Sequence, residues 1–404
     1  MKFAHLGDIH LGAWRYSKLR DANLKAFIKA IDLCIQKKVD FIIIAGDLFD
    51  TALPAIDNLR EAVKKFMQLK RLKIPVYIVA GSHDYSASGK TMLDVLQHAE
   101  LVCNVAQAEN DGETLKLKFT IDAKTKTKIT GLPGRKGMLE KNYYEQLDRN
   151  LLEHEEGYKI FLFHTAITEL KPKKLEKMES APVSMLPLNF NYYAGGHVHI
   201  VKNVSLPGYS NLVYPGPIFP NSFAEIEELG SGGFYLVEAN EGATELAYEP
   251  IVVHNAKSIK IDCDGKIPLE IFEKIIDEIK NKEFLNTIVT IRLHGRMREG
   301  KISEIDFRTI FDTLYSKSAY YVMKSTTMLE TQEFQEVKQE IGGVDNMEDR
   351  IITEHIGQSS IKFDINKIKE IMGVLSVFRE EGEKVNDYEK RILNEVNKTV
   401  GLED

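Results

Sequence analysis

The sequence predicts a layered α/β protein: a β-sandwich of two sheets flanked by helices, then a small α+β module and a helical tail. Three observations lead to this fold class. Strands and helices alternate from the first residues, residues 159–253 consist mostly of short strands and loops, and a new alternation begins near Ala256. With 404 residues, of which 43% are hydrophobic, the chain is long enough for two or three domains.

The N-terminal part begins as a βαβ unit. We expect a strand over residues 2–6, a helix over about 17–37 and a strand over 41–45, because the helix gathers its apolar side chains on one face. Those side chains are Ala26, Phe27, Ala30, Ile31, Cys34 and Ile35. The elements expected next are helices over about 56–67 and 91–98 and strands over about 76–80, 101–105, 115–121 and 126–131.

A second pattern begins near Ala256. Strand, helix, strand, helix and strand follow one another and predict a small α+β module, with elements at 258–263, 269–279, 287–293, 304–315 and 319–323. Gly342 and Gly343 lie in a polar stretch that indicates a linker, and only amphipathic helical patterns follow it. We therefore expect four parts, with boundaries at 1–255, 256–335, 336–347 and 348–404.

Five short polar motifs each follow an apolar run in the first half of the chain. They are Asp8-Ile9-His10, Gly46-Asp47, Gly81-Ser82-His83-Asp84, His164 and Gly196-His197-Val198-His199. We expect all five at the carboxyl ends of strands, the edge of an α/β fold where ligands bind. A single histidine of this kind is more often a hydrogen-bonded core residue. Together, the oxygen and imidazole ligands predict a site for two borderline-hard metal ions that acts on phosphate esters.

The composition argues against several classes of protein. A formal charge of −7 is not that of a generally basic nucleic-acid coat. Cys34, Cys103 and Cys263 lie far apart in apolar surroundings and indicate neither a disulfide framework nor a zinc knuckle. No apolar run approaches the ~20 residues of a membrane span, and the first residues already form a strand rather than a signal peptide. We expect a soluble, cytoplasmic protein.

The order of the five motifs resembles that of the calcineurin-like metallophosphoesterases. Within that family the chain is most similar to DNA double-strand-break repair nucleases of the SbcD and meiotic-recombination-eleven type. The resemblance covers essentially the whole chain, since the module at 256–335 resembles the DNA-capping domain of those nucleases. It implies a prokaryotic, nucleoid-associated exonuclease and endonuclease subunit that processes DNA ends and hairpins.

The resemblance also implies a role for each motif residue. The first ion would take Asp8, His10, Asp47 and His199, and the second would take Asp47, Ser82, His164 and His197. His83 would approach the scissile phosphate, while Asp84 would hold the ring and tautomer of His83. Manganese is the expected metal, because magnesium prefers an all-oxygen shell and this site offers four histidines.

Two positions depart from the family pattern. Ser82 stands where the family has asparagine, whose amide oxygen reaches farther and is a better donor than a serine hydroxyl. The second metal site is therefore expected to be weaker, or to use a water molecule held by Ser82. Asp50 stands where some archaeal relatives have a histidine associated with exonuclease action.

Candidate DNA contacts lie in loops near the expected site. Trp14, Tyr16 and Tyr85 could stack on exposed bases, and the charged candidates are Arg15, Arg135 and Lys136. The simplest interpretation of the lysine-rich run 171–177 is a solvated loop.

The tail carries two apolar stripes on otherwise charged helices. The first comprises Ile365, Ile368, Met372, Leu375 and Phe378, and the second comprises Tyr388, Ile392, Val396 and Val400. In the family this region binds the coiled coil of an ATPase called SbcC in bacteria, so Ile368, Met372, Leu375 and Phe378 are the expected contacts. The family also implies a homodimer, paired through helices near 55–70 and 91–98.

Two other functions stay open. A phosphatase or small-molecule phosphodiesterase could use the same site, although Thr51-Ala52 follow Asp50 where protein phosphatases of this superfamily carry an Arg-Gly pair. A non-catalytic scaffold with a weakened second site is the other alternative, and Ser82 is its only support.

Overall fold

The computed structural model describes residues 1–86, 89–110, 114–240, 243–331, 365–375, 377 and 385–400. The chain divides into two compact units, Met1–Leu329 and Glu330–Asp404. Among the described residues, no helix is long and apolar enough to cross a membrane.

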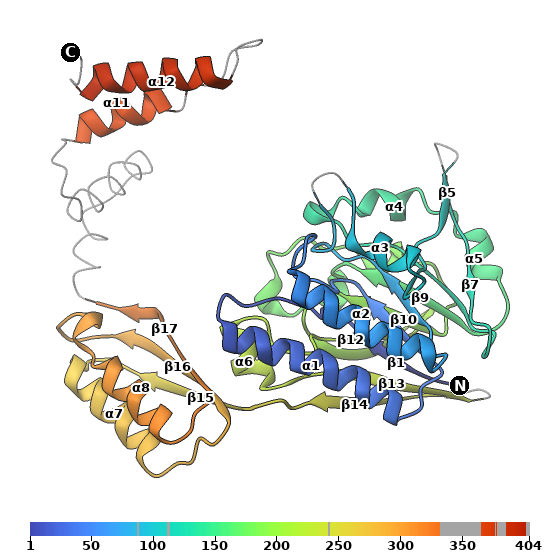
Figure 1. The fold of residues 1–404 in the computed structure, drawn as a ribbon, viewed down its shortest axis with the longest axis horizontal. Coiled ribbons are helices and arrows are strands. Elements are labelled where there is room, and N and C mark those ends of the chain that lie inside the picture. Colours follow the sequence, from blue (N-terminus) through green and yellow to red (C-terminus); the bar gives the residue numbers. More distant parts are fainter. Residues whose placement is uncertain are drawn as a thin grey trace. The chain divides into compact units, whose positions relative to one another are not determined.

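The first unit is built on two six-stranded sheets (Figure 1). The first sheet has the order β14 (Ala243–Ile251), β13 (Gly232–Asn240), β1 (Lys2–Leu6), β2 (Phe41–Ala45), β3 (Val76–Val79) and β4 (Cys103–Asn104). The second has the order β11 (Val201–Leu206), β12 (Tyr209–Pro215), β10 (Tyr192–Gly196), β9 (Lys159–His164), β8 (Lys128–Gly131) and β7 (Thr120–Ile121). Strands β1 to β4 run parallel, and so do β8, β9, β10 and β12.

Alternation of side chains along the strands makes this a sandwich. In β1, Phe3 points to a core between the sheets, whereas Ala4 and Leu6 join a second core under the helices. The ring of Phe3 stacks on Phe41 of its own sheet at 5.0 Å and meets Tyr192 of the other sheet edge-on at 5.2 Å. The expected fold class, a helix-flanked β-sandwich, is confirmed.

Helices cover the outer face of each sheet. The first sheet is covered by α1 (Ser17–Gln36), α2 (Ile56–Arg71) and α3 (Met92–His98), and Phe27 of α1 packs edge-on against Phe66 of α2. The second sheet is covered by α4 (Lys141–Glu145), α5 (Asn150–His154) and the surrounding loops. The remaining elements are α6 (Phe223–Leu229), the ribbon β5 (Ala108–Asn110) and β6 (Leu115–Leu117), and short 3₁₀ helices at Lys136–Met138, Thr168–Leu170, Lys173–Leu175, Val183–Met185 and Ile302–Glu304.

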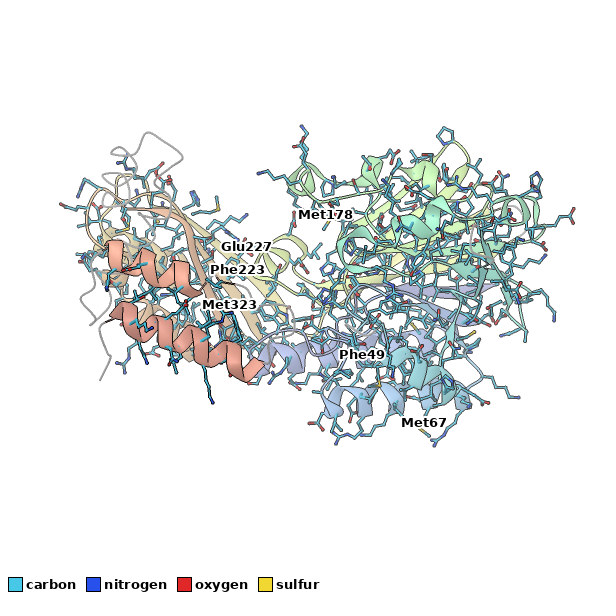
Figure 2. All side chains as sticks on the ribbon, turned by 90° about the horizontal axis from the view of Figure 1, so that it is seen from above. Phe49, Met67, Met178, Phe223, Glu227 and Met323 are labelled. Carbon is cyan, nitrogen blue, oxygen red and sulfur yellow. The ribbon has the colours of Figure 1, made fainter. Side chains whose placement is uncertain are left out.

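The α+β module has its own apolar core. Strands β15 (Asn255–Asp262), β16 (Thr287–Arg296) and β17 (Tyr321–Glu330) form a sheet whose buried side packs against α7 (Pro268–Lys280) and α8 (Phe307–Ser316). The module meets α6, where Arg292 pairs with the buried carboxylate of Glu227 at 2.7 Å and lies over the ring of Phe223. Phe223 and Glu227 of α6 are labelled in Figure 2. It belongs to the same compact unit as the sandwich, so the boundary expected at 255/256 stays a prediction.

The described part of the second unit is a pair of helices, α11 (Ile365–Leu375) and α12 (Val385–Val400), which pack against each other. Ile392 is buried, and the hydroxyl of Tyr388 donates to the carbonyl of Val377. Leu375 remains exposed. The expected linker at 336–347, Phe378, and the side chains of Ile368 and Met372 lie outside the described residues.

Candidate metal centre

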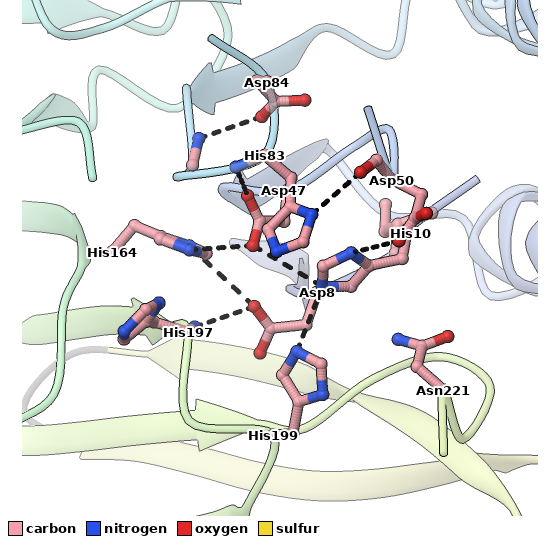
Figure 3. Close-up of polar contacts among 12 residues, drawn as sticks. Asp8, His10, Asp47, Asp50, His83, Asp84, His164, His197, His199 and Asn221 are labelled. Carbon is pink, nitrogen blue, oxygen red and sulfur yellow. Dashed lines mark hydrogen bonds and ion pairs between the residues drawn. The ribbon is translucent and has the colours of Figure 1, made fainter. Parts of the chain in front are cut away.

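The loops after β1, β2 and β3 of one sheet and the ends of β9 and β10 of the other converge on one site (Figure 3). Each predicted motif therefore reaches the same place from a different strand. The predicted metal ligands there are Asp8, His10, Asp47, Ser82, His164, His197 and His199. Asp8, Asp47 and His164 are at most 2% exposed, so their charges and lone pairs are largely shielded from water.

Five of these residues have a backbone conformation that L-amino acids seldom adopt. The φ angles of Asp8, His10, Asp47, His197 and His199 are 49°, 45°, 50°, 97° and 50°. Such positions cost on the order of 1–3 kcal/mol each and persist where the surrounding structure enforces them. Their concentration in one site indicates that the chain accepts local strain to aim these side chains inward.

Two glycines make room for the ligands. A Cβ atom on Gly81 would lie 2.2 Å from Oδ1 of Asp47, and one on Gly46 would lie 2.1 Å from Nδ1 of His164. Gly46 also has a φ of 83°. These glycines are therefore required by close approach as well as by the turn that follows each strand.

One group of ligand atoms comes from Asp8, His10 and His199. Nε2 of His10 lies 3.0 Å from Nε2 of His199. Nδ1 of His199 is held by Oε1 of Glu225 at 3.1 Å, and Nδ1 of His10 lies 3.4 Å from Oδ1 of Asp50. Because a carboxylate accepts hydrogen bonds, Nδ1 of His199 donates to Glu225, and the Nε2 atoms of both rings face the same space.

A second group comes from Asp8, Asp47 and His164. Nδ1 of His164 donates to the carbonyl of Ala45 at 2.8 Å, and Nε2 lies 3.1 Å from Oδ2 of Asp47. The ring of His197 lies edge-on to His164 at 5.1 Å, and the backbone N–H of His197 donates to Oδ1 of Asp8. Ser82 is buried and lines a cavity at the edge of this group.

This donor set fits divalent cations. Nε2 of His164 is buried without a hydrogen-bond partner among the described residues and lies 3.1 Å from Oδ2 of Asp47. Nε2 of His10 and Nε2 of His199 also face each other at 3.0 Å. A cation shared by these atoms satisfies all of them, with nitrogen and oxygen ligands suited to manganese, iron or zinc.

The pKa values of the histidines follow from the same contacts. Burial is the largest single influence on the pKa of His164 and lowers it, but the charges of Asp47 and Asp8 and the hydrogen bonds of the ring together raise this pKa to about 10. Burial likewise opposes a proton on His199, whereas Asp8 and Glu225 raise its pKa to about 9. Burial and the neighbouring His164 lower the pKa of His197 to about 4. In the metal-free site, His164 and His199 therefore each hold an additional proton, and a metal ion would have to displace these protons.

His83 lies beside the first group. Its Nδ1 is bonded to the carbonyl of Asp50 at 2.8 Å, its ring meets the ring of His10 edge-on at 4.8 Å, and its backbone N–H donates to Oδ1 of Asp47. The ring is thus held at the mouth of the site by the loop after β2.

The prediction that Asp84 contacts the ring of His83 is wrong. Asp84 instead accepts hydrogen bonds from the backbone N–H groups of Gly81, Phe49 and Leu48, at 2.9, 3.1 and 3.4 Å. Its carboxylate ties the loop after β2 to the loop after β3. Burial and the negative charge of Asp47 raise the pKa of Asp84 to about 6.

Sequence reasoning missed Glu225. Ser222 caps α6 by accepting from the N–H of Glu225, while the carboxylate of Glu225 receives the N–H of Asn221 and Nδ1 of His199. The Ser-x-x-Glu spacing at 222–225 is a recognisable helix-start signal. It does not reveal that the glutamate also orients a histidine from another loop.

The candidate DNA contacts have different surroundings. The indole N–H of Trp14 donates to the carbonyl of Pro220, and its ring packs on the core under the helices, so Trp14 supports the fold. Arg15 and Tyr16 are exposed, and Tyr16 lies 5.4 Å from the ring of Tyr321 in the module. The guanidinium group of Arg135 covers one face of Tyr85 at 3.7 Å, and Lys136 is exposed.

The chain is similar in sequence to known proteins. Residues 1–201 match the family model described as calcineurin-like phosphoesterase. The chain is 26% identical to the DNA double-strand break repair protein Mre11 of Archaeoglobus fulgidus, over 84% of this chain and 77% of the relative. It is 29% identical to the protein of the same name from Methanocaldococcus jannaschii, over 78% of this chain and 80% of the relative. Among solved structures, a dimetal phosphatase from Danio rerio covers 62% of this chain and 96% of its own, with 11% identity and a TM-score of 0.39.

Proposed function

Because residues 1–201 make this chain a member of the calcineurin-like phosphoesterase family, we propose that it is a two-metal-dependent DNA nuclease that processes double-strand-break ends. The observation that carries the proposal is the pair of ligand groups that share Asp8. Asp47 lies against both, 3.5 Å from Nε2 of His10 and 3.1 Å from Nε2 of His164. One carboxylate between two cation sites is what a bridged centre for phosphodiester hydrolysis needs.

Each ligand has a place in this proposal. The first ion is held by Asp8, His10, Asp47 and His199, and the second by Asp47, Ser82, His164 and His197, with manganese as the metal. Bound ions of this kind neutralise the charge of the phosphodiester and lower the pKa of a water molecule. The carboxylate of Glu225 orients the ring of His199, and the carboxylate of Asp50 lies 3.4 Å from Nδ1 of His10.

His83 is the proposed catalytic acid. With Nδ1 fixed on the carbonyl of Asp50, the ring offers Nε2 to the substrate. Protonated His83 can stabilise negative charge on the phosphate or deliver a proton to the leaving oxygen. Asp84 acts on this step only through the two loops that it joins.

DNA as the substrate is supported by the names of several relatives, which are DNA double-strand break repair proteins. A phosphatase or a small-molecule phosphodiesterase would leave the module at 255–330 and the tail helices without a role. Ser82 favours one variant of the proposal, in which the second ion is bound weakly. If the second ion is not bound at all, the protein is a non-catalytic scaffold.

We also propose a homodimer and an ATPase partner. Apolar side chains on α2 and α3 are exposed, including Ile56 at 82%, Val95 at 57% and Met67 at 42%, and a two-fold contact would cover them.

The exposed Leu375 of α11 is a described residue that suits a helix-in-groove contact with a coiled-coil ATPase. Deleting residues 345–404 should abolish co-purification with the ATPase. Full-stoichiometry complexes of the truncated chain would reject this assembly.

The nuclease proposal is tested by incubating the purified chain with labelled linear and hairpin DNA. Cleavage should depend on manganese, be weak in magnesium and stop in chelator. Asp47→Asn serves as the inactive control, and an exposed change such as Glu109→Gln on the β5–β6 ribbon serves as the matched surface control. Equal cleavage in chelator, or by the Asp47→Asn protein, would rule out the metal mechanism.

A further inference from the structure

A cavity of about 360 Å³ opens beside the second group of ligands. Ser82 lies in its wall together with Tyr85, Arg135 and Lys136. Two of these side chains are cationic, and no carboxylate lines the cavity among the described residues. The chain as a whole has 60 acidic and 53 basic residues, so a pocket whose charged lining residues are both cationic is a local feature.

Among the described residues, the guanidinium group of Arg135 in this cavity has no carboxylate partner. Its guanidinium group lies 3.7 Å over the ring of Tyr85, which fixes the plane of the group. Its Nε is buried and has no hydrogen-bond partner, and no carboxylate within the described ranges forms an ion pair with it. A buried donor on a permanent cation is costly when unpaired, and a planar guanidinium matches a phosphate group. The missing partner therefore has the chemistry of a phosphate.

The loop that carries Arg135 is fastened to the metal centre. The backbone N–H of Arg135 donates to Glu140, and the other carboxylate oxygen of Glu140 accepts from Thr165, which directly follows His164. The N–H of Gly134 donates to the carbonyl of Ala80 at the end of β3. A Cβ atom on Gly134 would lie 2.5 Å from the ring of His164. Arg135 is thus held at a fixed place relative to the second ion.

We propose that Arg135, supported by Tyr85 and Lys136, binds the phosphate group adjacent to the scissile phosphodiester of a DNA strand. This inference rests on the proposed nuclease function and adds to it a second phosphate-binding position, on the Ser82 side of the metal centre. A second cavity of about 400 Å³ has the carboxylates of Asp50 and Asp57 in its wall beside Arg20. Those carboxylates repel a phosphate, so the two cavities are electrostatically unlike.

The inference predicts that one extra phosphate improves a minimal substrate. The test compares kcat/KM under manganese for three dinucleotides with a single scissile bond: TpT, pTpT and TpTp. The parent chain should prefer one of the two phosphorylated forms over TpT by about tenfold or more, the scale of a charge-assisted hydrogen bond. Arg135→Gln should bring this preference ratio close to one, and Arg135→Lys should restore part of it. Arg20→Gln, in the other cavity, should keep the parent ratio.

A binding measurement separates the subsite from the nuclease proposal. In metal-free solution, calorimetry should show that thymidine 5′-monophosphate binds the parent chain about tenfold more tightly than thymidine, and that Arg135→Gln removes this difference. A parent that shows this difference but cleaves no diester would overturn the nuclease proposal and retain the subsite. The subsite would be overturned if the parent cleaves DNA but its kcat/KM is nearly the same for TpT and the phosphorylated dinucleotides. It would also be overturned if Arg135→Gln keeps the preference of the parent. A thermal unfolding midpoint equal to that of the parent verifies that each variant is folded.

Discussion

Nε2 of His10 and Nε2 of His199 face each other at 3.0 Å, and each ring turns its other nitrogen toward a carboxylate. The two histidines come from the loops after β1 and β10, which belong to different sheets of the sandwich. The two Nε2 atoms therefore face the same space. In the proposed metal centre this space is the first metal position, and Glu225 holds one of the two rings that face it.

The first prediction concerns Glu225. Glu225→Gln removes the charge that holds Nδ1 of His199, so affinity at the first metal position should fall by about 10- to 100-fold. Manganese titration followed by calorimetry measures this loss. Glu228→Gln is the matched control, because Glu228 lies on the same helix and pairs with Lys174 at the surface. Equal affinities for the parent and Glu225→Gln would mean that His199 is oriented without its carboxylate.

The second prediction concerns pH. In the metal-free chain the pKa values of His164 and His199 are raised to about 10 and 9, so both rings carry a proton at neutral pH. A metal ion must displace these protons, and its apparent affinity should therefore rise as the pH rises toward 9. At pH 7.5, calorimetry in two buffers of different ionisation enthalpy should give a release of about two protons per chain. A binding enthalpy that does not depend on the buffer would contradict the assignment of these rings as ligands.

The third prediction separates catalysis from metal binding. His83→Gln removes the proposed acid, so cleavage should fall by roughly 10²-fold or more while metal affinity changes little. The comparison is His98→Gln, a histidine at the end of α3 whose Nδ1 is bonded only to the backbone of its own helix. If His83→Gln lowered metal affinity as strongly as cleavage, His83 would be a ligand rather than an acid.

The fourth prediction uses the departure at Ser82. Ser82→Asn places an amide oxygen where the family has one, so the manganese concentration for half-maximal activity should decrease. If the parent already binds two ions tightly and this manganese concentration is the same in the variant, Ser82 is sufficient to hold the second ion.

Contacts between residues that are close in sequence can be predicted from the sequence, whereas contacts between distant residues depend on the fold. The strands that lead to Asp8, Asp47 and His164 are local patterns of apolar residues, and the motif after each strand is local too. The partner of Asp84 could not be foreseen, because its oxygens bind backbone N–H groups in a loop 35 and 36 residues away. The contact of Glu225 with His199 spans 26 residues and depends on how α6 meets β10.

The charged loops show the same limit. Arg135 and Tyr85 were separate candidates in the sequence, and only the fold stacks one on the other. The stack covers one face of Tyr85, so that this face is closed to base stacking, and it holds the guanidinium group that we propose as a phosphate ligand. Trp14 looked like a stacking residue as well, but the carbonyl of Pro220 and the core engage it.

The central claim is that two ions share Asp47, and manganese electron paramagnetic resonance tests it most directly. The parent chain should bind two Mn²⁺ per chain and give an exchange-coupled signal, because bridged ions in such sites lie roughly 3.5–4 Å apart. Asp47→Asn should lose the coupled signal, since the shared charge is removed. A parent that binds a single ion, or two ions with uncoupled spectra, would contradict the account.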